Sequence, residues 1–415
     1  MKKAVILSPL LICLVWPTLA QLVYEDRTYE ETIRTVQFYA AANAQDTSFP
    51  PVIRPGETNL VIEFDDLQPD RQNYYVKVLP CTWDWQEGML KDLDFMSEYN
   101  EFNITDYAFS SNTLIPYVHY RYQVPPPMIA GNYLLIVYRD GDRSNLILSR
   151  RFMVYNQMVN LVSDPVAGTA TLRKTRQPLQ FDISYNGIEV FNPLEYFHIT
   201  IRQNQRWNNI REGVSPSFLR DDQSIIEFRA PDPDAHFAGG NEFRFVDFRS
   251  LNYPGMNVDR LDRSTKPPQL YVAYDKPRTD EAYAQYNDMN GGFVIANRDY
   301  AEPRITGQYV NVTFTLRPTQ SLGKVYVVGA FNHWQISPES QMKPQPDGSL
   351  TMTTLLKQGF YNYQYVTAGA NTPDWSVEGS HFETENVYEV MVYLKSLQPN
   401  TDLLVGYFVL PVNRR

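Results

Sequence analysis

The sequence predicts an all-β protein made of tandem immunoglobulin-like or E-set β-sandwich domains that follow a cleaved signal peptide. Three observations support this fold class. The 415-residue chain is rich in aromatic residues, with 29 Tyr, 22 Phe and 6 Trp, and rings fit the half-buried surface of a pleated sheet. Apolar and polar side chains alternate with a period of two along many short segments. Residues that favour turns, mainly Gly and Pro, separate these segments.

The first 20 residues are typical of a signal peptide. Two lysines precede an apolar stretch over 4–16, which is too short to span a membrane, and residues 18–20 supply small side chains for cleavage. We expect export and a mature chain that begins at Gln21. The alternative is lipidation at Cys13, but Ile12 stands where a lipidation site requires a small residue.

Residues 21–157 are predicted to form the first β-sandwich. The segments with strand-like alternation are 60–64, 74–79, 117–124, 133–138 and 146–155. Asp140-Gly141 favours a tight hairpin turn between the last two of them. One short amphipathic helix is expected over 85–97, because apolar residues recur there at spacings of three and four.

The rest of the chain is predicted to hold two more sandwiches. A second domain is expected over 158–275 and a C-terminal E-set-like domain over 303–415, with a polar connector over 276–302 between them. The predicted strands of the second domain are 179–185, 195–203, 224–229, 242–248 and 269–274. Those of the C-terminal domain are 310–316, 324–331, 351–356, 360–366, 387–394 and 403–410.

Charge and cysteine content exclude several classes of function. The formal net charge of −10 argues against binding to a phosphate backbone, so nucleic acid is not an expected partner. After the first 20 residues no stretch approaches 18 consecutive apolar residues, and we expect no membrane span. Cys81 is the only cysteine in the predicted mature chain, so no internal disulfide can form. We interpret it as a small buried hydrophobe beside Trp83 rather than a reactive thiol.

No motif in the sequence indicates catalysis. The histidines are scattered singly, without the spacing of a zinc site: His119, His198, His236, His333 and His381. Residues 140–142 and 288–291 resemble fragments of calcium loops, but neither leads to a closing Glu, and we interpret both as turns. No nucleophile elbow or Gly-rich phosphate loop occurs. We therefore expect no enzyme activity, metal or cofactor.

The last domain contains a pattern with ligand-binding character. Residues 329–334, Gly-Ala-Phe-Asn-His-Trp, and the Tyr-rich segment 359–365 resemble the carbohydrate-binding module of glycogen-sensing kinase subunits and of branching enzymes. The resemblance implies three candidate glycan-binding residues: Trp334, Trp375 and Asn386. However, Gln364 stands where sugar binders carry Lys. The interpretation that we favour is an E-set sandwich that has lost sugar binding, in which both Trp side chains anchor loops.

A series of short motifs extends from the first predicted domain to the C-terminal one. They are Phe64-Asp65-Asp66-Leu67, Cys81 with Trp83-Asp84-Trp85, Ile104 to Tyr107, Gly131-Asn132-Tyr133, Arg151 to Val154, Asn290-Gly291, and Thr384-Glu385-Asn386. In this order they resemble the plug proteins of the type IX secretion system. Pro80 and the segment 402–404 depart from the family pattern.

The resemblance implies a non-enzymatic role. Plug proteins bind and seal the periplasmic opening of the outer-membrane translocon barrel when it is not engaged with cargo. We accordingly expect a periplasmic protein that associates with the outer membrane through this barrel and is monomeric outside the complex. The alternative is a periplasmic or surface glycan-binding protein that uses the C-terminal domain, and an enzyme of unknown type ranks third. The sequence does not indicate which residues contact the barrel.

Overall fold

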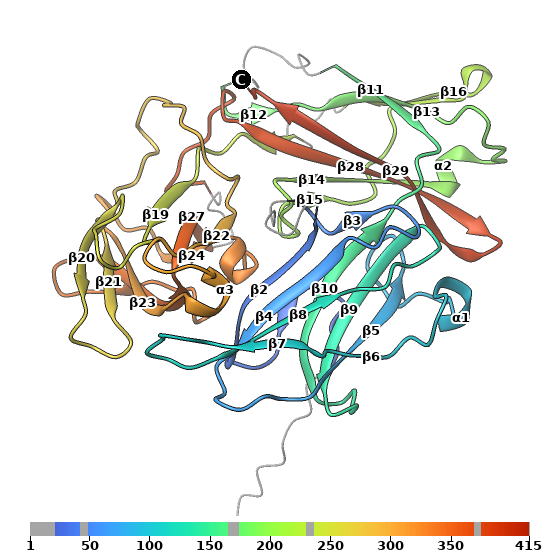
Figure 1. Cartoon of the computed structure of the whole chain (residues 1–415). Helices are drawn as coiled ribbons and strands as arrows, with labels where there is room; N and C mark the ends of the chain where they lie inside the picture. The colour runs from blue at the N-terminus through green and yellow to red at the C-terminus, as the bar shows by residue number, and fades with distance from the viewer. Residues whose placement is uncertain (1–20, 42–48, 165–173, 230–235, 369–374, 415) are drawn as a thin grey trace, which may run out of the picture.

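The computed structural model describes residues 21–41, 49–164, 174–229, 236–368 and 375–414 (Figure 1). The expected signal peptide, with Cys13, lies outside the described residues. The described chain forms strands with only a few short helices, so the predicted all-β fold of tandem sandwiches is confirmed. The helices are α1 (Asp92–Phe95), α2 (Pro193–Tyr196), α3 (Pro303–Thr306), η2 (Asp221–Gln223) and η4 (Ala330–Asn332).

The first sandwich, blue to teal in Figure 1, consists of two sheets. One has the order β1-β10-β9-β5-β6, with β3 parallel to β10: β1 (Arg27–Thr28), β3 (Val52–Ile53), β5 (Tyr74–Cys81), β6 (Phe102–Asn103), β9 (Gly131–Arg139) and β10 (Leu146–Val154). The other has the order β2-β4-β8-β7: β2 (Ile33–Ala40), β4 (Leu60–Asp66), β7 (Asp106–Phe109) and β8 (Val118–Gln123). Alternate residues of both sheets, such as Phe64 and Leu135, share one buried core.

The second sandwich also has two main sheets. The first has the order β11-β13-β17-β16: β11 (Asn160–Asp164), β13 (Gln180–Ser184), β16 (Phe218–Arg220) and β17 (Ile225–Arg229). The second has the order β15-β14-β28-β29: β14 (Phe197–Gln203), β15 (Ile210–Arg211), β28 (Asn386–Leu397) and β29 (Asn400–Val412). A pair of short strands, β12 (Arg176–Gln177) and β18 (Phe237–Ala238), lies beside them. Ile183, Ile199 and Val390 belong to the common core.

The third sandwich, yellow to orange in Figure 1, surrounds the long strand β27 (Gly359–Ala368). Three strands pair with β27: β19 (Arg244–Asp247), β22 (Phe293–Ile295) and β24 (Lys324–Val328). The facing sheet has the order β20-β21-β23-β26-β25: β20 (Val258–Asp262), β21 (Gln269–Val272), β23 (Tyr309–Leu316), β25 (Lys343–Pro344) and β26 (Leu350–Lys357). Val246, Phe314 and Tyr363 contribute to its core.

Strand pairing does not follow the expected domain boundaries. β28 and β29 lie within the range expected for the C-terminal domain, but they pair in the second sandwich, where Ile199 of β14 lies opposite Val392. Conversely, β19, β20 and β21 lie within 158–275 but pair in the third sandwich. Alternation predicts where strands occur, because it reports a buried face, but it does not specify the partner of a strand.

Two smaller expectations also differ from the structure. The connector over 276–302 contains β22, which pairs with β27 and is therefore part of the third sandwich. The helix expected over 85–97 is limited to the four residues of α1. Met89 and Leu93, which were expected on its buried face, are exposed instead. Tertiary contacts of this loop outweigh its helical periodicity.

Candidate functional site at the junction of the three sandwiches

A buried ion pair joins the first sandwich to the third. Lys357, the last residue of β26, places Nζ 2.6 Å from Oδ2 of Asp65 on β4, and each side chain is only 1% exposed. The hydroxyl of Tyr309 donates to the same Oδ2 at 2.7 Å. His119, directly opposite Asp65 in the β4–β8 register, lies 2.7 Å from Oδ1. Burial alone would raise the pKa of Asp65, but the charge of Lys357 and the bond from His119 outweigh burial and lower the pKa.

A second acidic residue of β4 extends this contact. Glu63 accepts a hydrogen bond from the Tyr39 hydroxyl at 2.7 Å and from Arg121 Nε at 3.1 Å, both within the first sandwich. Arg304 of α3 belongs to the third sandwich, and its Nη2 lies 3.1 Å from Oε1 of Glu63, the atom that accepts these two bonds. The end of β4 therefore makes polar contacts with both sandwiches. Few relative positions of the two sandwiches would satisfy all of these hydrogen bonds and ion pairs.

Arg150 of β10 makes another contact with the third sandwich. Its Nη2 lies 2.8 Å from Nε2 of His333, and its Nη1 donates to the carbonyl of Arg27 at 2.7 Å. Burial lowers the pKa of Arg150 to about 10. Burial, and then the charge of Arg150, hold the pKa of His333 well below its usual range. His333 is therefore neutral at physiological pH and accepts a hydrogen bond from Arg150.

Aromatic and cationic side chains join the first sandwich to the second. The Trp207 ring contacts two guanidinium groups, with Arg151 of β10 at 4.3 Å from the ring centroid and Arg202 of β14 at 3.9 Å. Arg202 also binds Glu389 of β28 through two bonds of 2.7 and 2.8 Å. The contact of Trp207 with Arg151 therefore joins the first and second sandwiches, as the contacts of Asp65 and Arg150 join the first to the third.

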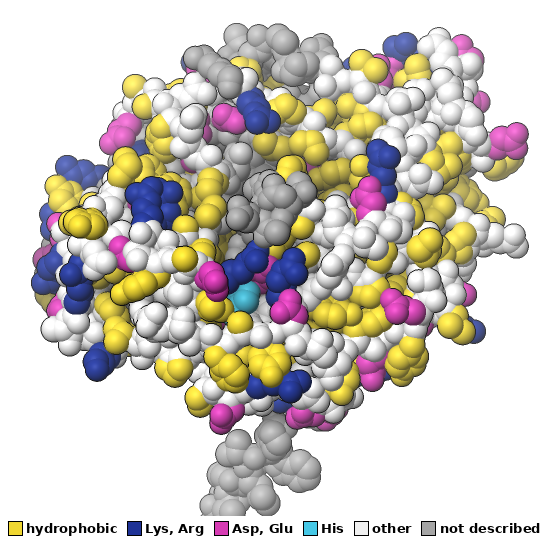
Figure 2. Space-filling view, viewed as in Figure 1, with side chains coloured by type: hydrophobic (Ala, Val, Ile, Leu, Met, Phe, Trp, Pro, Cys, Tyr) yellow, Lys and Arg dark blue, Asp and Glu magenta, His cyan; other side chains and the backbone are white. Residues whose placement is uncertain are grey.

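A cavity of about 1980 Å³ opens at this junction, and residues of all three sandwiches line it. Figure 2 shows a hollow near the centre of the molecule where basic, acidic and His side chains lie side by side. Lining residues include Asp26, Arg150, Arg202, His333 and Glu385. Their charges are mixed, and among the described residues there is no cluster of three or more His, Cys, Asp or Glu side chains placed to hold a metal ion.

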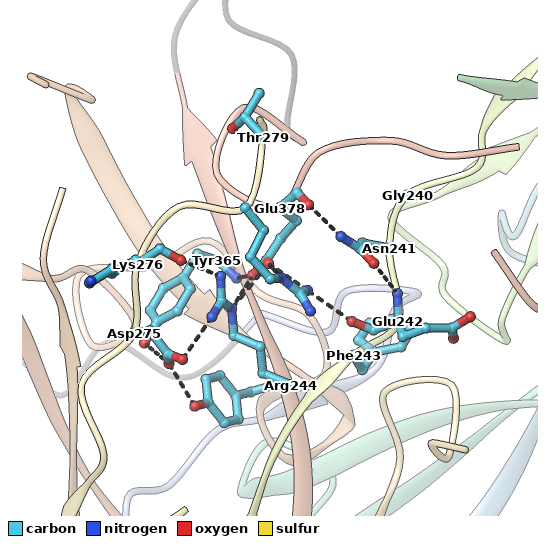
Figure 3. A network of polar contacts seen from close by, with 12 residues as sticks. Gly240, Asn241, Glu242, Phe243, Arg244, Asp275, Lys276, Thr279, Tyr365 and Glu378 are labelled. Carbon is cyan, nitrogen blue, oxygen red and sulfur yellow. Dashed lines mark hydrogen bonds and ion pairs between the residues drawn. The ribbon is translucent and has the colours of Figure 1, made fainter. Parts of the chain in front are cut away.

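The third sandwich contains a buried network of its own, shown in Figure 3. Glu378 accepts from Arg244 Nε at 3.0 Å and from Arg278 Nη2 at 2.7 Å. Asp275 accepts from Arg244 Nη1 at 2.7 Å and from the Tyr365 hydroxyl at 2.8 Å. Burial acts to raise the pKa of Glu378, but the two arginines outweigh it and lower the pKa to about 2. Each charge is paired within the protein, so the loss of one partner would leave an uncompensated buried charge.

The segment 288–291, which resembles a calcium loop, forms a turn. Asp288 Oδ1 accepts from the backbone N–H of Asn290 at 2.7 Å, and Gly291 has a left-handed φ of 84°. A Cβ atom at Gly291 would lie 2.1 Å from the Trp334 ring, so this position requires glycine on two grounds. Burial, and to a smaller degree the nearby Glu242, raise the pKa of Asp288 to about 7.

The structure does not expose two of the three candidate glycan-binding residues. Trp334 is 7% exposed, and its ring packs against Phe243 and the guanidinium of Arg206. Asn386 is 3% exposed and donates to Gln177 Oε1 at 2.9 Å and to the Gly239 carbonyl at 2.8 Å. Neither can offer a free ring face or a free amide to a sugar without rearrangement.

Trp375 and Cys81 complete the residues singled out from the sequence. Trp375 is half-buried, with Arg176 at 5.9 Å from its ring centroid, so it alone of the three candidates has an accessible face. Cys81 is 1% exposed, and burial raises the pKa of its thiol to about 12. The prediction of a buried cysteine is confirmed, and a thiol with a raised pKa carries little of the reactive thiolate.

The sequence interpretation missed the contacts between sandwiches. Asp65 and Asp66 are the last two residues of β4, both are buried, and Asp66 accepts from the Tyr74 hydroxyl at 2.7 Å. The available signal was the position of two acids directly after a strand segment in which Leu60, Ile62 and Phe64 are apolar. A carboxylate in such a strand is buried only when a partner neutralises it.

The fold and the junction define a class of protein in which three β-sandwiches are locked together by buried polar contacts. Comparison with known proteins places the first sandwich in a family. Residues 33–156 match the model of the type 9 secretion system plug protein 1st domain, so this part of the chain belongs to that family and the predicted resemblance is confirmed for it.

A further comparison extends beyond the first sandwich. A solved crystal structure of a hypothetical protein from Parabacteroides merdae is similar over 94% of this chain and 100% of that chain, with 25% sequence identity and a TM-score of 0.86. The arrangement of all three sandwiches is therefore found in another protein. A search of curated proteins gives no match. Within the described residues, no helix is long and apolar enough to cross a membrane.

Proposed function

We propose that this protein is an exported, non-enzymatic component of the type IX secretion system that occupies the periplasmic opening of the outer-membrane translocon barrel when no cargo is engaged. The observation that carries the proposal is the family match of residues 33–156 to the plug protein first domain. The periplasm is then its location, the barrel its partner, and the cleaved signal peptide its route of export. Outside the complex it is a monomer.

The contacts between sandwiches support this role. A protein that blocks an opening must keep its shape under thermal motion. The buried charge pair of Asp65 with Lys357 disfavours relative movement of the first and third sandwiches, since separating them would leave unpaired charges.

A permeability assay tests the proposal. A strain that lacks the protein should take up a large hydrophilic dye that the intact outer membrane excludes, and expression of the full chain should restore exclusion. A matched strain that also lacks the translocon barrel should exclude the dye, because no opening remains. Unchanged permeability, together with purification from mild detergent that recovers no barrel protein, would contradict the proposal.

A further inference from the structure

Five large apolar side chains are exposed at one end of the molecule, on three segments that are distant in sequence. Met89 and Leu93 lie before and within α1, Phe191 and Leu194 before and within α2, and Leu397 at the end of β28. Each is between 53% and 101% exposed. In Figure 1, α1, α2 and the tip of the β28–β29 hairpin lie on the same side of the molecule. We call these five residues the apolar rim.

Specific contacts hold the three segments together. Asn400 at the hairpin tip places Nδ2 3.4 Å from Sδ of Met89, and α2 packs against β28. The backbone N–H of Trp83, in the loop before α1, donates to Asp402 Oδ2 of β29 at 3.0 Å. The Trp83 ring stacks on His198 of β14 at a centroid distance of 4.5 Å. The rim is therefore pre-organised, and little conformational entropy would be lost when a partner covers it.

The charges beside the rim are mainly acidic. The exposed acidic side chains of these segments are Glu87, Asp94, Glu98, Glu189 and Glu195, whereas the exposed basic ones are Lys91 and Lys395. An acidic border repels an anionic lipid surface. It attracts a protein surface that carries Lys and Arg, because complementary charges steer association and fix its register.

We propose that the apolar rim is the docking surface for a protein of the type IX secretion system whose contact surface is apolar at its centre and edged with Lys and Arg. The inference rests on the proposed function and specifies where the partner binds. Exposed large apolar side chains that gather from separate segments are typical of protein interaction sites. The charged groups that surround these apolar residues correspond to the polar periphery found around the apolar centre of such interfaces.

Two rim variants and one control of the full-length protein test the inference. The first variant combines Met89→Gln, Leu93→Gln and Leu397→Gln, and the second combines Phe191→Gln and Leu194→Gln. The control combines Tyr253→Gln and Met256→Gln, which are 75% and 64% exposed between β19 and β20 of the third sandwich. Melting temperatures equal to wild type verify that each variant is folded.

Binding to the solubilised outer-membrane translocon complex is then measured for each protein. We expect each rim variant to bind at least about tenfold more weakly than wild type, which corresponds to about 1.4 kcal/mol. The control should bind as wild type does. Added salt should weaken binding of the wild type, and Glu195→Lys should reduce this dependence, because it removes an attractive charge.

Four outcomes would overturn the inference. If wild type and rim variants bind the complex equally, the rim is not the docking surface, while the proposed function stands. If wild type itself binds no complex, both fail. Sedimentation of wild type, but not of rim variants, with phosphatidylglycerol vesicles would assign the rim to a lipid surface. A wild-type dimer in light scattering that the rim variants abolish would assign it to a second copy of this chain.

Discussion

Oδ2 of Asp65 and Nζ of Lys357 meet across the boundary between the first and third sandwiches, although 292 residues separate them in sequence. Water has almost no access to either group. The attraction between the two charges is therefore weakly screened, and the loss of either partner would leave an isolated charge in a low-dielectric setting.

Replacing Lys357 by Met should destabilise the protein by about 3–5 kcal/mol, because it leaves the Asp65 carboxylate buried without its cation. The loss is measured as the free energy of unfolding in urea. The double variant Lys357→Met with Asp65→Asn should be more stable than the single one, since no charge remains. Lys343→Met, at an exposed position, serves as the control and should change stability by less than about 0.5 kcal/mol. Equal losses for Lys357→Met and Lys343→Met would contradict the importance of the pair.

Acid should weaken the third sandwich through Glu378. Its pKa of about 2 in the folded protein lies below the ordinary value of 4.5, so the carboxylate stabilises the fold above pH 4.5 and this contribution is lost as the pH falls toward about 2. The free energy of unfolding should therefore decline across this window. Glu378→Gln should reduce the decline, and an unaltered slope in this variant would exclude Glu378 as its source.

Asp288 should have the opposite effect. Its folded pKa of about 7 lies above the ordinary value of 3.8, so the folded state binds the proton more tightly. Its contribution to stability is complete below pH 3.8 and is lost as the pH rises through about 7. Asp288→Asn cannot titrate, so it should lose less stability than wild type between these values. Urea unfolding curves at the two ends of this pH range give the free energy of unfolding of both proteins. An equal loss of stability in wild type and Asp288→Asn would refute the prediction.

His333→Ala should cost about 1–3 kcal/mol, because it removes the acceptor for a buried N–H of Arg150. His333→Asn is the matched control. Asn retains an acceptor and tolerates the left-handed φ of 54° at this position, so its loss of stability should be smaller. Thermal and urea unfolding measure both variants. If Ala and Asn are equally destabilising, the contact with Arg150 does not contribute.

Trp334→Ala should destabilise the protein by about 3–5 kcal/mol, since it removes a large buried ring. Trp375→Ala, at a half-buried position, should cost less. Titration with α-glucan oligosaccharides should leave the Trp fluorescence of wild type unchanged. Quenching that Trp375→Ala abolishes would revive the glycan-binding alternative.

The sequence was sufficient to predict the fold class and most strands, because each of these depends on local alternation. β23 (Tyr309–Leu316) is an example, since its period-two pattern reports one buried face directly. Asp65 and Lys357 could not be paired in this way. Their contact depends on how two sandwiches dock, and no local pattern in either strand encodes the other. The same limit explains Trp334, whose ring makes a T-shaped contact with Phe243 from a segment assigned to a different domain.

The exchange of strands between the second and third sandwiches has a consequence for biogenesis. The central sheet of the second sandwich lacks β28 and β29 until residues 386–412 are available, although β14 precedes them by almost 200 positions. In the export that we propose, the chain emerges from a channel with its N-terminus first, so β14 stays unpaired on that side while the intervening sandwich is delivered. Folding factors that shield exposed sheet edges would have their greatest effect during this interval.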